Sequence, residues 1–143
     1  MPEQREAMQR LGARVKLALE EADLTAYGEL LDPGVRWGPP EGRSPVCKNR
    51  EQVLRWYQRG QNSGTRAQVS EVSVIGDRLL VGLSVAGTPA AKKRGGRADR
   101  WQVLTVRDGR IVEIVGFEER SQALARAGDA GAGFRPSARR RSL

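Results

Sequence analysis

The sequence contains no histidine, only one cysteine and few aromatic residues. Because histidine is absent, the chain itself cannot supply a Ser-His-Asp triad, a histidine general base or a histidine-ligated metal site. The single cysteine, Cys47, supports neither a disulfide framework nor a zinc cluster, and we expect a small buried apolar group rather than a reactive thiolate. We therefore predict no metal and no cofactor. Without histidine, any acid-base role falls to Asp, Glu, Tyr, Lys or Cys47.

Long apolar runs are also missing. No run approaches the ~20 residues that a membrane-spanning helix requires. The N-terminal residues are polar and of mixed charge, so no signal-peptide core is expected. These absences predict a cytoplasmic protein that makes no contact with a membrane.

Positive charge is in excess, with 25 Lys and Arg against 17 Asp and Glu, which gives a net charge of +8. Much of the excess lies in a glycine-rich segment, residues 92–97, and in a C-terminal run, residues 135–141. A charge run of this kind is usually a solvated surface. We therefore do not expect nucleic acid as a partner, and an anion- or nucleic-acid-associated protein is the weakest of three functional hypotheses.

The spacing of apolar residues changes from a helical to a strand period along the chain. In the N-terminal half they recur every three or four positions, and a capping-box-like pair, Asn49 and Gln52, precedes the third such segment. The predicted helices cover about residues 3–22, 24–31 and 50–59, with a short strand at 35–37. Alternation and the Asp108-Gly109 turn then predict antiparallel strands, at about residues 68–75, 79–86, 101–106 and 111–117.

This order predicts an α+β fold in which N-terminal helices pack on one face of a curved antiparallel sheet. Residues 87–98 are expected to form a long basic hairpin connection, and residues 119–126 a short closing helix. We expect one domain over residues 1–127. Residues 128–143 have almost nothing apolar to bury and are expected to form a disordered basic tail.

Three segments carry a resemblance to a known superfamily: VRWGPP at 35–40, NREQVLRWY at 49–57, and WQVLTVRDGRIVEIVGFEER at 101–120. In this order they resemble the nuclear transport factor 2-like superfamily, and within it the SnoaL-like group found in bacteria. The resemblance implies a cone in which the helices and a strongly curved antiparallel sheet enclose one pocket, and a homodimer that pairs through the sheet. Known members include ketosteroid isomerases, limonene-epoxide hydrolases, polyketide cyclases and dehydratases, beside proteins with no assigned reaction.

The catalytic groups of these enzymes have no counterparts at the matching positions. The resemblance places the isomerases' base aspartate at Gly38, their tyrosine near Val15 and their second acid at Gln102. It places the final-strand aspartate of the epoxide hydrolases near Gly116. Our first hypothesis is therefore a SnoaL-like protein of unassigned reaction that binds a small, largely apolar molecule in the pocket.

Aromatic and polar residues near the expected pocket are the candidates for ligand binding. Aromatic rings can stack on a flat apolar ligand, although they can equally fill a core that is poor in large side chains. An inward-facing Gln102 would need a hydrogen-bond partner, because an unpaired buried group costs about 1–3 kcal/mol. The predicted ligand-binding residues are Tyr27, Trp37, Trp56, Arg100, Gln102, Leu104 and Ile114.

The second hypothesis is a SnoaL-like enzyme of the cyclase, isomerase or dehydratase type, with Glu118 and Tyr57 as an acid-base pair. A carboxyl group beside an apolar cavity has a raised pKa, which would suit Glu118 to such a role. In the competing interpretation, Glu118 only places negative charge at the start of the last helix, where the helix dipole favours it.

Overall fold

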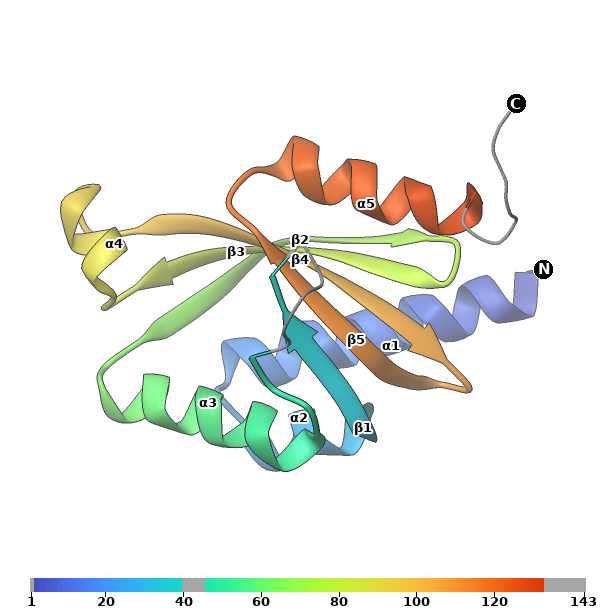
Figure 1. Cartoon of the computed structure of the whole chain (residues 1–143), viewed down its shortest axis with the longest axis horizontal. Helices are drawn as coiled ribbons and strands as arrows, with labels where there is room; N and C mark the ends of the chain where they lie inside the picture. Colours follow the sequence, from blue (N-terminus) through green and yellow to red (C-terminus); the bar gives the residue numbers. More distant parts are fainter. Residues whose placement is uncertain (1, 40–45, 133–143) are drawn as a thin grey trace.

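The computed structural model describes residues 2–39 and 46–132 (Figure 1). The helices of these residues are α1 (Pro2–Glu20), α2 (Leu24–Leu30), α3 (Arg50–Asn62), the short α4 (Pro89–Lys93) and α5 (Arg120–Ala132). The strands are β1 (Leu31–Gly38), β2 (Arg66–Ile75), β3 (Arg78–Ala86), β4 (Ala98–Arg107) and β5 (Arg110–Phe117). The predicted α+β class is confirmed. None of the described helices is long and apolar enough to cross a membrane.

The strands form one sheet in the order β1-β5-β4-β3-β2. The prediction that β2, β3, β4 and β5 pair in succession as antiparallel strands is confirmed. The prediction of a wholly antiparallel sheet is wrong, because β1 runs parallel to β5. The two strands meet only after the chain has passed through α3 and the rest of the sheet, and periodicity carries no information about such a distant pairing.

The predicted strong curvature of the sheet is also wrong. Figure 1 shows a twisted sheet that is not strongly curled, so the strands do not close into the cone that the resemblance implied. Pairing register shifts between Val69 and Glu71 and between Thr105 and Val106. A register shift of this kind bends and twists the strand that carries it. An alternating sequence pattern does not reveal where such shifts occur.

β1 begins directly after α2 and is longer than the strand predicted at 35–37. It includes Asp32, Pro33 and Gly34, where the N–H of Gly34 donates a hydrogen bond to Asp32 Oδ2 at 2.9 Å. Pairing with β5 is irregular over this stretch. Proline is tolerated here because β1 lies at the edge of the sheet, where a missing N–H breaks no central ladder.

The start of α3 follows the local sequence closely. Asn49 Oδ1 accepts a hydrogen bond from the Gln52 N–H at 2.9 Å, and Gln52 Oε1 accepts one from the Lys48 N–H at 2.7 Å. The predicted capping pair is therefore confirmed. It sets the direction of α3, which carries Trp56 and Tyr57 toward the sheet.

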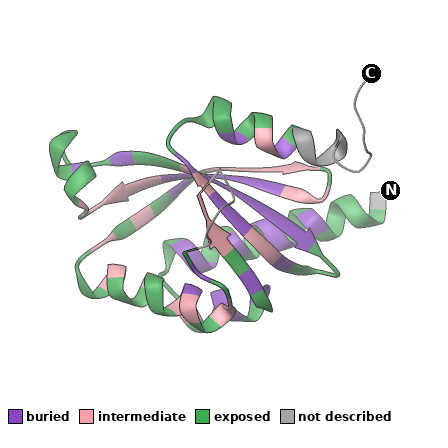
Figure 2. Ribbon diagram, viewed as in Figure 1, coloured by how far each residue is buried: buried purple, intermediate pink, exposed green. Residues whose placement is uncertain are grey.

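The core has two parts, one on each face of the sheet (Figure 2). Side chains alternate along β4, so Gln102, Leu104 and Val106 face α1, α2 and α3, whereas Val103 faces α5. Leu104 and Val103 are both fully buried. The larger part of the core lies on the helical face and holds Val15 and Val53, from α1 and α3.

The C-terminal helix and the β3–β4 connection differ from their predictions. α5 continues through Gly128 to Ala132, beyond the predicted helix end at residue 126 and the predicted start of the tail. Residues 133–143, which hold most of the predicted disordered tail, lie outside the described residues. The connection expected as a plain loop contains α4, whose first turn is capped by Thr88. Near the end of this connection, Arg97 donates hydrogen bonds to the hydroxyl and carbonyl oxygens of Ser84, at 2.6 and 2.7 Å.

Candidate functional site

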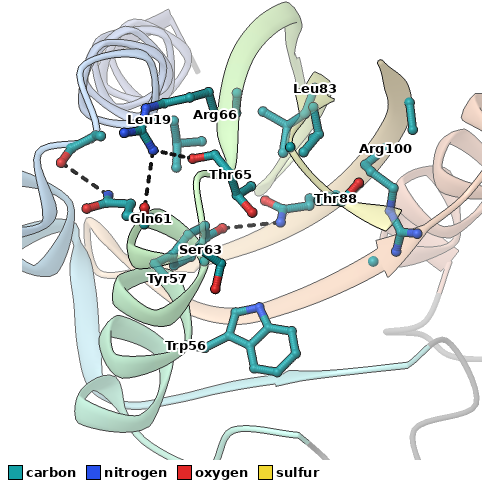
Figure 3. Close-up of a pocket in the computed structure, with 18 of the residues that line it drawn as sticks. Leu19, Trp56, Tyr57, Gln61, Ser63, Thr65, Arg66, Leu83, Thr88 and Arg100 are labelled. Atoms are coloured by element: carbon teal, nitrogen blue, oxygen red, sulfur yellow. Dashed lines mark hydrogen bonds between the residues drawn. The ribbon is translucent and has the colours of Figure 1, made fainter. Parts of the chain in front are cut away.

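A pocket of about 620 Å³ opens between the helices and the sheet. Its walls come from the end of α1, the second half of α3, the end of β3, the start of β4 and the start of α4. Figure 3 shows Trp56 and Tyr57 on α3 and Leu83 and Arg100 on the strand side. The size lies within the range of about 300–1,000 Å³ that small-molecule sites occupy.

Three aromatic residues form one wall of this pocket. Trp56 and Tyr57 are consecutive on α3, so their side chains leave the helix about 100° apart. Trp37 on β1 stacks on Tyr57, with ring centroids 5.2 Å apart, and meets Trp56 edge-on at 5.8 Å. Trp56 is 45% exposed, which leaves a large apolar ring uncovered at the mouth of the pocket. A flat ligand could cover this ring.

A hydrogen-bonded polar pair faces the same pocket. Gln102 is only 6% exposed, and its Nε2 donates to the Tyr57 hydroxyl at 3.2 Å. Gln102 Oε1 is buried without a hydrogen-bond partner among the described residues. If the amide is turned over, Tyr57 donates to Oε1 and Nε2 becomes the open atom. Among the described residues, one end of this buried amide thus has no partner.

Burial controls the protonation state of the tyrosines. It raises the pKa of Tyr57, although the hydrogen bond from Gln102 opposes the shift. Burial also raises the pKa of Tyr27 well above its usual value, and the neighbouring Tyr57 adds to the effect. The Tyr27 ring is fully buried edge-on to Tyr57 at 5.3 Å, and its hydroxyl is close to Tyr57 but makes no well-directed hydrogen bond. Both phenols therefore stay neutral at physiological pH and do not act as phenolate bases.

Charged residues in the lining are mostly cationic. Arg66 donates to the carbonyl oxygens of Gln61 and Thr65 at 3.4 and 2.7 Å. Arg59 lies over the Trp56 ring at 5.8 Å. The acidic residue of the described lining, Glu20, accepts hydrogen bonds from Lys16 and from the Val69 N–H, which lower its pKa.

Residues 13–114 match the family model for the SnoaL-like domain. The chain belongs to the SnoaL-like domain family. The match covers most of the chain, from within α1 to within β5, and it includes all of α3 and β4. No curated protein matches the chain.

Three solved bacterial structures have the same fold. A Kribbella flavida protein provisionally named a ketosteroid isomerase has 18% identity and a TM-score of 0.65, covering 80% of this chain and 78% of that one. A Sinorhizobium meliloti protein provisionally named a polyketide cyclase has 24% identity and a TM-score of 0.60, covering 76% and 94%. A nuclear transport factor 2-like protein of unknown function from Burkholderia pseudomallei has 17% identity and a TM-score of 0.61, covering 83% and 95%. At these identities the likeness establishes the nuclear transport factor 2-like fold and nothing about the reaction.

The SnoaL-like domain brings together some of the residues predicted from its sequence. The predicted residues that line the pocket are Trp37, Trp56, Tyr57, Arg100 and Gln102. The predicted residues buried behind the lining are Tyr27, Leu104 and Ile114. Their roles in binding remain predictions.

The structure does not bring Glu118 to its predicted partner Tyr57. Glu118 is exposed and is not part of the pocket lining, since β5 ends at Phe117 and the chain turns there into α5. Of the predicted acid-base pair, only Tyr57 lines the pocket. Cys47 is buried, as predicted, and burial raises the pKa of its thiol.

Sequence reasoning missed the polar rim of the SnoaL-like pocket. Arg59 is one such residue, and its place three positions after Trp56 on a helix could have revealed that the two share a face. Thr65 and Arg66 join the rim because the turn before β2 packs on the turn after β3. Gly87 permits this contact, since its φ is +86° and an added Cβ would overlap the Gly64 carbonyl. No local pattern predicts such an approach.

Proposed function

We propose that this SnoaL-like domain binds a small, largely apolar molecule in the pocket. Trp37, Trp56 and Tyr57 contact its apolar body, and the Tyr57–Gln102 pair contacts one polar atom. The observation that carries the proposal is the open, buried end of the Gln102 amide in the pocket lining. Such an atom costs about 1–3 kcal/mol when it has no partner. The open atom, Gln102 Oε1, is an acceptor, and a ligand hydroxyl would donate to it.

The homodimer expected from the family resemblance is also a proposal. In it, two copies pair through their sheets, and each keeps its own pocket on the helical face. Analytical ultracentrifugation at several concentrations measures the mass directly, and a monomer throughout would contradict it.

The test of ligand binding uses N-phenylnaphthylamine, a neutral aromatic probe whose fluorescence rises in apolar sites. We expect the protein to bind it and its melting temperature to rise, because a ligand that binds only the folded state stabilises that state. Trp56→Ala should weaken binding about tenfold, which corresponds to about 1.4 kcal/mol of lost contact. Leu17→Ala is the matched control, because Leu17 is 57% exposed and lies outside the pocket lining. Equal losses in both variants, or no binding at all, would contradict the proposal.

The alternative function is an enzyme of the cyclase, isomerase or dehydratase type. The observation that favours it is the convergence of two neutral hydrogen-bonding groups, Tyr57 and Gln102, within 3.2 Å in the pocket. The Tyr57 O–H, which accepts a hydrogen bond from Gln102 and is free to donate, can stabilise charge that develops on a carbonyl oxygen. Of the two candidate bases, Glu20 is already engaged and Glu118 lies outside the lining.

Binding of naphthol separates the two functions. A site built to stabilise an oxyanion binds the naphtholate form more tightly, so the absorption spectrum of bound naphthol shifts to that of the anion at a pH below the ionisation of free naphthol. A simple ligand site keeps the naphthol neutral. Tyr57→Phe should abolish any anion signal while leaving the binding of N-phenylnaphthylamine nearly unchanged. An anion signal that survives in this variant would contradict the enzymatic role of Tyr57.

A further inference from the structure

A second open polar position lies in the pocket beside Gly116. Gly116 pairs with Gln102 across β4 and β5, and it is part of the pocket lining. A Cβ added at Gly116 would lie 3.9 Å from Trp37 Nε1 and 4.0 Å from Arg100 Nη2. Apart from Gly116 and its chain neighbours, the described residues place no other heavy atom within 4 Å of that point. The glycine thus leaves a space that two nitrogen groups face.

Both of these groups are hydrogen-bond donors only. The indole of Trp37 has one N–H and the guanidinium of Arg100 has five, and neither group has an acceptor. Among the described residues, neither nitrogen group has a hydrogen-bond or ion-pair partner. Arg66 and Arg59, by contrast, contact carbonyl oxygens and the Trp56 ring. The space over Gly116 therefore has donors on two sides and lacks an acceptor.

We infer that the ligand of this pocket carries a carboxylate, which Arg100 and Trp37 hold over Gly116. The inference rests on the proposed function, because it describes which ligand the same pocket takes. A planar carboxylate can accept two parallel hydrogen bonds from one guanidinium, and such charge-assisted bonds are stronger than neutral ones. Arg100 is exposed, so its charge remains hydrated while the pocket is empty. Solvent also screens the attraction, which keeps its contribution modest.

Two anchors on one strand then define the ligand class. Gln102 and Arg100 are two positions apart on β4 and face the same side, about 7 Å apart along the backbone. Gln102 with Tyr57 would bind a hydroxyl or carbonyl group, and Arg100 with Trp37 would bind the carboxylate. The aromatic wall between α3 and β1 would cover the apolar body. The ligand is accordingly an aromatic or similarly flat acid with a second polar atom.

The test compares naphthoate with its neutral analogue naphthamide, each measured by displacement of N-phenylnaphthylamine. Arg100→Gln should weaken naphthoate binding about tenfold, or about 1.4 kcal/mol, and leave naphthamide binding within about twofold. Arg107→Gln is the matched control, because Arg107 is an exposed residue at the other end of β4 and the variant loses the same charge. It should leave both affinities unchanged.

A second pair of variants places the acceptor in the protein itself. Gly116→Asp should put a carboxylate beside Arg100 and block naphthoate, whereas Gly116→Asn adds a side chain of nearly the same size without the charge. Gly116 does not have a positive φ, and ordinary contact distances surround the new Cβ, so both variants should fold. The expected result is a larger loss of naphthoate binding in the Asp variant than in the Asn variant. Their melting temperatures verify folding.

The outcomes distinguish the inference from the function on which it rests. If N-phenylnaphthylamine binds with the expected dependence on Trp56, but Arg100→Gln affects naphthoate and naphthamide equally, the carboxylate site is wrong and the pocket stands. Equal losses in the Asp and Asn variants would have the same meaning. If neither the neutral probe nor either analogue binds, the proposed function and the inference both fail.

Discussion

The open amide of Gln102 leads to a prediction that joins stability with binding. Tyr57→Phe and Gln102→Met are replacements of similar size that remove the two members of the polar pair singly or together. In the single variant Tyr57→Phe, the amide of Gln102 loses its remaining partner and has two open ends. In Gln102→Met, the open amide atom disappears, but the buried Tyr57 hydroxyl loses its donor. In the double variant, no polar atom of the pair is left.

The magnitudes follow from the number of open buried atoms in each protein. Each costs about 1–3 kcal/mol, whereas replacing both partners of a hydrogen bond by apolar groups of the same shape is close to neutral. Tyr57→Phe should therefore destabilise the protein by about 1–3 kcal/mol, and Gln102→Met should change little, within about 1 kcal/mol. The double variant should be more stable than the wild type by about 1–2 kcal/mol, because the Tyr57–Gln102 pair of the wild type already holds one open buried atom, Gln102 Oε1. The implied coupling between the two positions is about 2–5 kcal/mol.

Guanidinium-induced unfolding of the four proteins measures this coupling, and melting temperatures should move by about 2–4 °C per kcal/mol. In parallel, the double variant should keep N-phenylnaphthylamine binding and lose any preference for naphthol over naphthalene. A double variant that is less stable than both singles would show that the pair contributes to the packed structure as a unit. In that case the interpretation of Gln102 as a residue held open for a ligand would be refuted.

Two further predictions concern the sheet face that α5 covers. Gly82→Ala should destabilise the protein by about 1–3 kcal/mol, because the new Cβ would overlap the Trp101 ring and lie 2.8 Å from its Cη2 atom. Gly128→Ala should instead stabilise α5 by about 0.5–1 kcal/mol, because no described atom lies within 4 Å of the added Cβ. Thermal melts compare the two variants. Two hydrogen bonds from Arg120 hold the pKa of Glu71 at about 2, so this carboxylate contributes stability above its unfolded pKa of about 4.5 that is lost as the pH falls toward 2. Glu71→Gln should therefore lower the melting temperature at about pH 7 and much less at about pH 2–3, and equal effects at both would contradict the pairing.

Much of the fold was predictable because local interactions encode it. Asp108 and Gly109 both adopt positive φ, 54° and 78°, as a two-residue hairpin turn requires, and the chain signals this turn by the residue pair itself. The cap of α3 is likewise made by residues within four positions of each other. The alternation along β4 correctly placed Gln102 and Leu104 on one face, because side-chain direction in a strand repeats every two residues.

The pairing direction and bend of the sheet were predicted wrongly for a different reason. The parallel contact of β1 with β5 joins Trp37 to Ile114, far apart in the chain, and neither strand carries a local signal for the other. Strong curvature was an expectation from the family resemblance, and the register shifts that set the actual shape are invisible in an alternating pattern. Tyr57 and Gln102 are likewise far apart in the chain, 45 positions, and they meet only through that arrangement.

The residue types of the chain alone exclude histidine chemistry and identify the turns, caps and buried faces, since these depend on side-chain chemistry and on neighbours a few positions away. The composition of the pocket depends instead on how distant segments pack. That packing leaves Glu118 at the surface and turns Gln102 into a buried amide with one open end. It also turns Gly116, a position without a side chain, into a space between the donors of Trp37 and Arg100. A site made by contacts across the sheet has no linear pattern, because each contribution acquires its meaning from a partner elsewhere in the chain.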